Sequence, residues 1–293
     1  MKIAITGASG FIGKELLAVL NNNKGVKINS LTRGSIDNKA SSVCSWITTD
    51  YSVNSLIDGI KGCDIVIHLA GVRGTTNNLE DFAVNIDMTD NILRAMIAVG
   101  TKRIVFASSI SVYDDEKLIP WKENSPLRGR TAYGDSKIQC EKLIQEYAEK
   151  NDLTYAIARV AQVIGEGEKR RGMMNAFIDT ARIQGTIKVM GKSEAKRQYI
   201  YVKDLAEVLT VLAIGNNLYN TNSNMVLNVG MKKAYSNIEI ARIVNEVFNN
   251  NTPIDYDDSY DETIKSAYMD TYRLTNSLGY NTLDMHESIK ACL

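Results

Sequence analysis

A short strand-like segment at residues 2–6, apolar at 3–5, leads into the sequence TGASGFIG at residues 6–13, which places glycines at positions 7, 10 and 13. Gly7 permits a tight turn off a strand, Gly10 lets the backbone approach a pyrophosphate, and Gly13 lets the next helix pack close to the sheet. The N-terminus of that helix offers free N–H groups and a positive dipole end to phosphates. Glycines also occur in merely structural turns. Their place between a predicted strand and a predicted helix nevertheless predicts dinucleotide binding.

Strand and helix patterns alternate over the first 160 residues. The predicted strands span 2–6, 26–32, 44–49, 64–69, 103–108 and 154–160. The predicted helices span 11–22, 79–99 and 131–150. Apolar strands separated by helices indicate right-handed crossovers and a sheet covered on both faces. The predicted fold class is therefore α/β, with a Rossmann-like doubly wound parallel sheet.

The alternation becomes looser after about residue 165. Shorter helices are predicted at 173–184, 203–214 and 236–248, and short strands near 187–190, 199–202 and 226–229. No Pro-rich or Ser-rich linker separates this part from the first. We predict a dinucleotide-binding Rossmann domain over 1–164, with 196–215 returning to it. Residues 165–293 are predicted to form mainly a smaller C-terminal α/β substrate-binding lobe.

Composition excludes several classes of protein. Lys and Arg number 34 against 34 Asp and Glu, and this zero net charge argues against a nucleic-acid-binding surface. The apolar runs are too short to cross a bilayer, and the apolar stretch at residues 3–5 is too short for a secretory signal. Four scattered cysteines and two histidines show no metal-ligand spacing. We expect a cytoplasmic protein with no nucleic-acid partner, no membrane partner and no metal.

The end of the second predicted strand bears on the choice of cofactor. An acidic side chain there would bind the ribose hydroxyls of NAD and repel a 2′-phosphate. The chain instead has Thr32, Arg33 and, two residues on, Ser35. Arg33 can make charge-assisted hydrogen bonds to a phosphate, to which Ser35 could add one, although Arg33 could also be a solvated loop residue. The sequence favours NADP(H), with NAD(H) possible.

The pattern Tyr-x-x-x-Lys occurs three times, starting at Tyr113, Tyr133 and Tyr199. Only Tyr133 and Lys137 fall within one predicted helix, where a spacing of four puts both on one face. They also follow a strand that ends in two serines, the second being Ser109. A free tyrosine is a poor base because its reference pKa is about 10, and a nearby ammonium stabilises its phenolate. A serine hydroxyl can then bond the reacting oxygen.

Together these features resemble the extended short-chain dehydrogenase/reductase family, in its NAD(P)-dependent nucleotide-sugar epimerase, dehydratase and reductase branch. The resemblance covers essentially the whole chain and includes DIVIHLAG at 64–71, RIVFASSISVY at 103–113 and RQYIYVKD at 197–204. It implies that Ser109 is the catalytic hydroxyl, that Tyr133 is the acid/base, and that Lys137 is its partner and a ribose anchor.

The resemblance also implies the remaining contacts. The cofactor-binding set is Gly7, Ser9, Gly10, Phe11, Ile12, Gly13, Arg33, Ser35, Asp50, Tyr51, Leu69, Ala70, Gly71, Tyr133 and Lys137. The substrate-binding set is Ser109, Ser111, Gln162 and Arg197, with Arg197 on the diphosphate. The family's dimer-forming helices correspond to 79–99 and 131–150, which implies a homodimer. The apolar side chains of these segments are Phe82, Ile86, Ile92, Leu93, Met96, Ile138, Leu143, Ile144 and Tyr147.

Some positions depart from the family pattern. Ile110 and Ser111 stand where 4,6-dehydratases carry an Asp-Glu pair, which argues against dehydration. Gln162 replaces an Asn that many members use on the substrate. The stretch 255–262 has no second phosphate-binding arginine, so Lys265 or Lys169 would share the diphosphate with Arg197.

The leading functional hypothesis is an NADP(H)-dependent oxidoreductase that reduces a nucleotide-linked 4-keto sugar, because reductases commonly exchange NADPH at every turnover. The alternative is a nucleotide-sugar 4-epimerase, which uses the same triad of Ser109, Tyr133 and Lys137 with a tightly bound NAD. A small aldehyde or ketone reductase is a third possibility, and it would not need Arg197. A catalytically silent nucleotide-sensing or scaffold protein is disfavoured because Ser109, Tyr133 and Lys137 are all present.

Overall fold

A computed structural model describes residues 1–34, 43–168, 172–191, 193–215, 224–257, 259 and 265–292. The chain divides into two compact units. The first comprises 1–114, 124–160 and 205–227, and the second comprises 115–123, 161–204 and 228–293. The division at residue 160 lies four residues before the predicted boundary at 164. The segment that returns to the first unit is 205–227 rather than 196–215.

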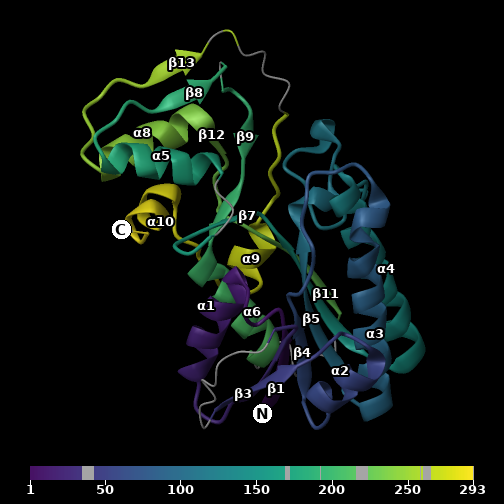
Figure 1. The fold of residues 1–293 in the computed structure, drawn as a ribbon. Coiled ribbons are helices and arrows are strands. Elements are labelled where there is room, and N and C mark those ends of the chain that lie inside the picture. The colour runs from purple at the N-terminus through teal and green to yellow at the C-terminus, as the bar shows by residue number, and fades with distance from the viewer. Residues whose placement is uncertain are drawn as a thin grey trace. The chain divides into compact units, whose positions relative to one another are not determined.

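The first unit is built on a seven-stranded sheet with the order β11-β6-β5-β4-β1-β2-β3 (Figure 1). Its strands are β1 (Lys2–Thr6), β2 (Lys27–Thr32), β3 (Cys44–Thr48), β4 (Ile65–His68), β5 (Arg103–Ser109), β6 (Thr154–Val160) and β11 (Met225–Val229). Every pairing from β3 across to β6 is parallel. The strand order reverses between β1 and β4, and this reversal is where doubly wound folds bind ligands. The predicted α/β, Rossmann-like fold is confirmed.

Helices cover both faces of this sheet (Figure 1). They are α1 (Phe11–Asn21), α2 (Val53–Ile60), α3 (Ala83–Val99), α4 (Ala132–Asn151) and α6 (Val202–Ile214), with 3-10 turns η1 (Leu79–Phe82) and η2 (Ile110–Val112). Helices α2, α3 and α4 lie side by side on one face, and their apolar sides pack on Val66, Phe106 and Ile157 of the strands. Helix α2 was not predicted. It begins after Ser52, whose hydroxyl accepts a hydrogen bond from the Ser55 backbone N–H.

The second unit contains three two-stranded sheets. β7 (Gln162–Ile164) pairs in parallel with β10 (Tyr199–Tyr201), β9 (Lys196–Arg197) pairs antiparallel with β12 (Tyr235–Ser236), and β8 (Lys188–Met190) pairs in parallel with β13 (Asp255–Asp257). The remaining elements are η3 (Glu116–Leu118), α5 (Met173–Arg182), α8 (Asn237–Val247), α9 (Tyr272–Asn276) and α10 (Met285–Lys290). Capping boxes start α8 and α10. The second unit has its own apolar core, which includes Phe177, Tyr199 and Ile240.

No helix among the described residues is long and apolar enough to cross a membrane.

Candidate active site

The turn after β1 is shaped for the close approach of a ligand. Gly7 has a φ of 72°, and a Cβ there would lie 2.8 Å from the Ala70 backbone nitrogen. The Gly10 N–H donates to the Gly7 carbonyl at 2.9 Å. A Cβ on Gly13 would overlap that same carbonyl, so only glycine lets α1 start this close to the turn. Among the described residues no side chain caps α1, which leaves its first N–H groups free for a phosphate.

A cavity of about 510 Å³ opens at the carboxyl ends of β1, β2 and β4, all within the first unit. Its lining residues are Gly7, Ser9, Gly10, Thr32, Arg33, Gly34, Tyr51, Leu69, Ala70, Gly71, Val72 and Met88. The cavity therefore has a glycine turn, an uncapped helix start and a volume in the range of cofactor sites. These features fit a dinucleotide, whose pyrophosphate would lie on Gly7, Ser9 and Gly10.

The cavity includes eight of the predicted cofactor contacts: Gly7, Ser9, Gly10, Arg33, Tyr51, Leu69, Ala70 and Gly71. Thr32, Gly34, Val72 and Met88 also line it and were not predicted. Phe11, Ile12, Gly13, Asp50, Tyr133 and Lys137 are not among its lining residues. Ser35 and Lys169 lie outside the described residues.

Asp50 directs its carboxylate into the start of α2. It accepts hydrogen bonds from the Ser52 backbone N–H at 2.8 Å and from the Ser55 hydroxyl at 2.6 Å. The hydrogen bond from the Ser55 hydroxyl lowers the pKa of this carboxyl most, and the bonds to Ser52 lower it further, to about 2. The carboxylate therefore organises the turn, and the next residue, Tyr51, adopts a φ of 64°.

The cavity wall near the end of β2 carries one charged side chain and no acid among its described lining residues. That side chain is the exposed Arg33. Burial raises the pKa of the Tyr51 phenol. The hydrogen bond with the Gly7 backbone and the positive charge of Arg33 act in the opposite direction. The Ser9 and Thr32 hydroxyls hydrogen-bond each other at 3.0 Å. This end of the cavity thus offers a cation and hydroxyl groups.

Ser109 ends β5 at the carboxyl edge of the sheet. Its hydroxyl accepts a hydrogen bond of 3.1 Å from the Ser111 backbone N–H and so caps the short turn η2. The Ser111 carbonyl accepts from the Arg130 N–H at 2.9 Å, just before α4 begins. A Cβ on Gly134 would overlap that carbonyl, so Gly134 lets α4 start directly against η2.

Tyr133 and Lys137 lie in the first turns of α4, as the spacing predicted. Tyr133 is half-buried, with its ring edge-on to Phe82 at 5.8 Å between centroids. Lys137 is buried, and its Nζ donates to the Ala107 carbonyl at 2.9 Å. The ammonium lies 4.5 Å from the Phe106 ring centroid and 5.8 Å from that of Tyr133. Lys137 therefore places a positive charge beside the Tyr133 phenol.

The other two Tyr-x-x-x-Lys pairs lack this arrangement. Tyr113 is fully buried, and its hydroxyl accepts a hydrogen bond from Arg159 at 2.7 Å. Tyr199 is also fully buried, in β10, and burial raises the pKa of its phenol to about 12. Neither hydroxyl is accessible to a substrate.

Two buried polar residues, His68 of β4 and Asn85 of α3, make hydrogen bonds to segments beside the site. Burial, together with the charge of Lys137, lowers the pKa of His68 to about 3, so this ring is neutral. Its Nδ1 lies 2.8 Å from the Thr6 hydroxyl and its Nε2 lies 3.2 Å from that of Thr89. The Asn85 side chain makes two hydrogen bonds to the backbone of Val72 on the cavity wall. It accepts one from the Val72 N–H at 2.7 Å and donates one to the Val72 carbonyl at 3.0 Å.

The other predicted substrate contacts, Gln162 and Arg197, belong to the second unit. Gln162 is exposed at the start of β7, and its backbone N–H donates to the Gln198 carbonyl at 3.1 Å. Arg197 is half-buried in β9 and is bridged to Ala267. Lys265, two residues before Ala267, lies 3.8 Å from the Glu116 carboxylate. In the second unit, Gln162 and Arg197 thus lie in β7 and β9, and Lys265 lies two residues before the bridge to Arg197.

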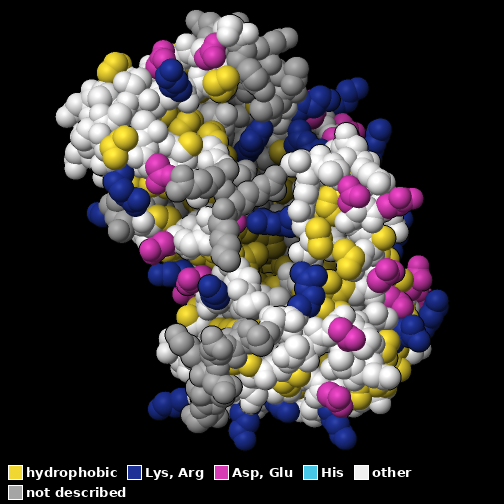
Figure 2. Space-filling model, in the orientation of Figure 1, with side chains coloured by type: hydrophobic (Ala, Val, Ile, Leu, Met, Phe, Trp, Pro, Cys, Tyr) yellow, Lys and Arg dark blue, Asp and Glu magenta, His cyan; other side chains and the backbone are white. Residues whose placement is uncertain are grey.

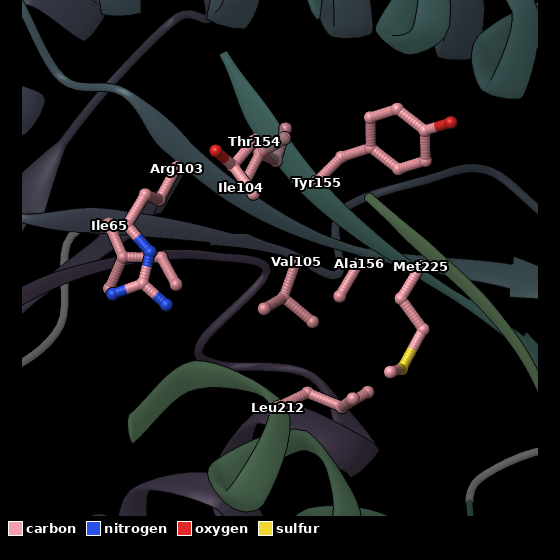
Figure 3. Close-up of a pocket in the computed structure, with 9 residues that line it drawn as sticks. All are labelled: Ile65, Arg103, Ile104, Val105, Thr154, Tyr155, Ala156, Leu212 and Met225. Atoms are coloured by element: carbon pink, nitrogen blue, oxygen red, sulfur yellow. The ribbon is translucent and has the colours of Figure 1, made fainter. Parts of the chain in front are cut away.

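A second hollow lies at the opposite, amino-terminal ends of β5 and β6 (Figure 3). Arg103 and Thr154 start these two strands, and Leu212 of α6 closes the hollow. Its volume is about 20 Å³, which is room for about one water molecule. It is therefore no candidate for a cofactor or substrate.

Comparisons with known proteins agree with this geometry. A putative UDP-glucose 4-epimerase from Methanocaldococcus jannaschii is 29% identical over 98% of this chain and 96% of its own length. The solved UDP-N-acetylglucosamine 4-epimerase from Bacillus cereus is 29% identical, with a TM-score of 0.87 over 99% of this chain and 97% of its own. The UDP-glucuronic acid 4-epimerase of Bacillus cereus, solved with UDP-glucuronic acid and NAD, is 21% identical, with a TM-score of 0.84 over 100% of this chain and 98% of its own, and shares the fold.

The family model described as the NAD dependent epimerase/dehydratase family matches residues 3–230. This range contains the glycine turn, every residue that lines the 510 Å³ cavity, and Ser109, Tyr133 and Lys137. The chain therefore belongs to the NAD-dependent epimerase/dehydratase family, within the extended short-chain dehydrogenase/reductase enzymes.

Proposed function

We propose that this enzyme is a nucleotide-sugar 4-epimerase, the alternative rather than the leading hypothesis from the sequence. The observation that carries the proposal is the arrangement of Tyr133 beside the buried Lys137 ammonium, in the same unit as a dinucleotide cavity. The similarity to 4-epimerases over nearly the full length of both chains supports the epimerase over the reductase. Ile110 and Ser111 supply no carboxylate for dehydration.

The proposed chemistry assigns one task to each residue. Tyr133 accepts the proton of the sugar 4-hydroxyl and later returns it to the 4-oxygen. Lys137 stabilises the phenolate form through its charge, and Ser109 donates a hydrogen bond to the reacting oxygen. A nicotinamide cofactor, when bound in the cavity, supplies the hydride acceptor and donor for the sugar C4. Inversion at that carbon would require the hydride to come back to the opposite face of the sugar.

We assign recognition of the substrate diphosphate to Arg197 and Lys265 of the second unit. Arg197 is bridged to Ala267, and Lys265 precedes that bridge by two residues. Arginine forms bidentate, charge-assisted bonds with phosphate, and lysine adds a point charge. Lys265 forms an exposed pair with Glu116 at 3.8 Å, and surface pairs of this kind contribute little to stability. Gln162, two positions before Ile164 on the neighbouring strand β7, offers an amide to the sugar.

The function is tested by incubating the purified enzyme with UDP-glucose, UDP-N-acetylglucosamine and UDP-glucuronic acid and separating the 4-epimers by chromatography. We expect interconversion of at least one pair without net consumption of cofactor. Nucleotide released by denaturing the purified protein identifies the resident cofactor. Absence of epimer formation, combined with stoichiometric NADPH oxidation by a nucleotide-linked 4-keto sugar, contradicts the epimerase.

One observation favours that second candidate, an NADP(H)-dependent reductase of nucleotide-linked 4-keto sugars. Arg33 is the one charged group among the described residues lining the cavity. A 2′-phosphate placed there would gain a charge-assisted bond. The same argument makes NADP(H) the favoured cofactor under either activity, whereas NAD(H) lacks the phosphate.

Replacing Arg33 tests the cofactor preference directly. We expect wild-type enzyme to bind NADPH about tenfold or more tightly than NADH, because a charge-assisted bond contributes roughly 1.5–3 kcal/mol. Arg33→Ala should abolish that difference while NADH affinity stays the same, as measured by fluorescence titration. Arg242→Ala removes an exposed arginine from the second unit and should change neither affinity. Equal wild-type affinities for the two cofactors would overturn the NADP(H) assignment.

We also propose a homodimer formed through α3 and α4. Six of the expected apolar side chains are buried within the protomer: Phe82, Ile92, Leu93, Met96, Ile138 and Ile144. Ile86, Leu143 and Tyr147 stay partly exposed, and Ile97 is 39% exposed. Ile86 and Ile97 lie eleven residues apart, about three turns, and so share one face of α3. Figure 2 shows hydrophobic side chains among charged ones on the side of the view where α3 lies.

Light scattering at micromolar concentration tests the dimer. We expect a mass of twice the 32.5 kDa of one chain for the wild type. Ile97→Glu should give a folded monomer, because the new charge would be buried in the interface. Ile183→Glu changes a side chain that is 78% exposed in the second unit and should leave the dimer intact. A monomeric wild type contradicts the proposal.

A further inference from the structure

A fully buried ion pair lies directly beneath the catalytic residues. Glu141 of α4 and Arg159 of β6 are 1% and 3% exposed. Arg159 donates hydrogen bonds to both carboxylate oxygens of Glu141. Its Nη2 lies 2.7 Å from Oε2, and its Nε lies 3.1 Å from Oε1 and 3.2 Å from Oε2. The proposed chemistry assigns no task to either side chain.

The pair connects α4 to the strand that ends in Ser109. Ser108 and Arg159 are directly paired in the register of β5 with β6, so both side chains face α4. The Ser108 hydroxyl donates to Glu141 Oε1 at 2.5 Å. One carboxylate on α4 is thus held by two neighbouring strands, and one of its partners is the residue next to Ser109.

The same arginine also holds the segment that follows Ser109. Arg159 Nη1 donates to the Tyr113 hydroxyl at 2.7 Å, and its guanidinium carbon lies 5.1 Å from the centre of that ring. Tyr113 is fully buried and comes directly after η2, the turn that the Ser109 hydroxyl caps. Arg159 therefore fixes the far end of this turn.

On α4, Tyr133, Lys137 and Glu141 are spaced by four residues and line one side of the helix. Lys137 is tied to the Ala107 carbonyl at 2.9 Å, and Glu141 is tied to Ser108. Successive turns of the catalytic helix therefore bind successive residues of β5. Sliding or rotating α4 against Ser109 would break both attachments.

Stability alone is a poor explanation for this arrangement. Two charges taken out of water lose their hydration, and well-packed apolar side chains of similar volume commonly stabilise a protein as well or better. What the ion pair adds is directional geometry between three elements: the catalytic helix, the end of β5 and the turn after Ser109.

We propose that the Glu141–Arg159 pair, with Ser108 and Tyr113, is a positioning device that sets Ser109 against Tyr133 and Lys137. The proposal rests on the catalytic roles proposed above. Neither side chain touches the reacting atoms, so both are positioning residues. A misplacement of about 1 Å in a catalytic group is enough to cost about 10²-fold in rate.

The experiment compares three variants with the wild type. Glu141→Gln should lower kcat about 10²-fold while KM and cofactor affinity stay within about threefold, because only the geometry of the chemical step is affected. The double variant Glu141→Leu with Arg159→Met leaves no unpaired buried charge. It should recover the wild-type melting temperature while kcat stays low. Ile144→Ala removes a fully buried side chain from the same helix, and it should lower the melting temperature with kcat retained.

The rate measurements can overturn the proposal in two ways. A double variant that regains both melting temperature and kcat shows that the pair is only structural. So does a Glu141→Gln variant that loses no more kcat than Ile144→Ala. If Glu141→Gln fails to fold, the double variant carries the test by itself.

Amide hydrogen exchange separates this proposal from the proposed function. Residues 109–113 should exchange faster in Glu141→Gln and in the double variant than in the wild type or in Ile144→Ala. This measurement needs no turnover. An enzyme without epimerase activity would contradict the proposed function, while unchanged exchange at 109–113 would contradict the positioning role.

Discussion

Tyr133→Phe is expected to lower kcat about 10²–10⁴-fold, the usual contribution of a positioned general acid–base. The substitution removes one hydroxyl and keeps the ring that packs edge-on to Phe82 at 5.8 Å. Cofactor affinity should change little, because the proposed ribose anchor is the Lys137 ammonium and not the Tyr133 phenol. The loss should therefore appear in kcat, measured with the best substrate of the epimer screen.

The matched control is Tyr199→Phe, the same substitution in another Tyr-x-x-x-Lys pair. Tyr199 is fully buried, and among the described residues its hydroxyl has no hydrogen-bond partner. Removing an unsatisfied buried hydroxyl should leave kcat unchanged and the melting temperature equal or higher. If Tyr133→Phe keeps more than about a tenth of the wild-type kcat, Tyr133 is not the acid/base.

The sequence predicted most reliably those elements whose signal is local and repeated. The strand at 154–160 coincides with β6, and the helix predicted at 131–150 is α4 at Ala132–Asn151. The glycine spacing located the phosphate turn because each glycine meets a specific steric demand. Gly7 needs a positive φ, and Gly13 has no room for a Cβ.

Short elements escaped prediction. Helix α2 has eight residues, and strands β9 and β12 have two each. A period of two or of 3.6 cannot be recognised over so few positions. These strands form because long-range partners supply their hydrogen bonds, as Tyr235 does for Arg197. That information is absent from any local window.

Contacts between distant residues were the main omission within the site. The spacing of Tyr133, Lys137 and Glu141 was visible in the sequence, but the partner of Glu141 was not. Arg159 lies eighteen residues away on β6 and reaches Glu141 because α4 packs against β6 in the folded chain. Asp50 shows the converse, since its local bonds to Ser52 and Ser55 take its carboxylate away from the cavity lining.

The sequence placed the reductase ahead of the epimerase because of a residue that bears on the cofactor and not on the reaction. Arg33 put the reductase first, but a cation at the end of β2 bears on the 2′-position of the cofactor. It does not determine whether the hydride returns to the same sugar. Ser109, Tyr133 and Lys137 serve both reactions, so the residues of the triad cannot separate them. The similarity of the whole chain to 4-epimerases is what favours the second hypothesis.

Lys137→Met should reduce both turnover and cofactor affinity, and this double effect distinguishes it from Tyr133→Phe. We expect kcat to fall by at least about 10²-fold, because the phenolate loses the ammonium beside it. Cofactor affinity should fall about tenfold, as expected when a charge-assisted hydrogen bond from the ammonium to the ribose is lost. Methionine nearly matches lysine in length and removes a buried charge, so the protein should remain folded.

Lys142→Met provides the control, since Lys142 is exposed on the same helix. It should alter neither kcat nor the affinity for cofactor, measured by fluorescence titration on the same preparations. A Lys137→Met enzyme that binds cofactor normally but turns over slowly would assign Lys137 to the phenolate alone. One that keeps wild-type turnover would remove it from the mechanism, because its Nζ, 2.9 Å from the Ala107 carbonyl, would then serve only to hold α4 on β5.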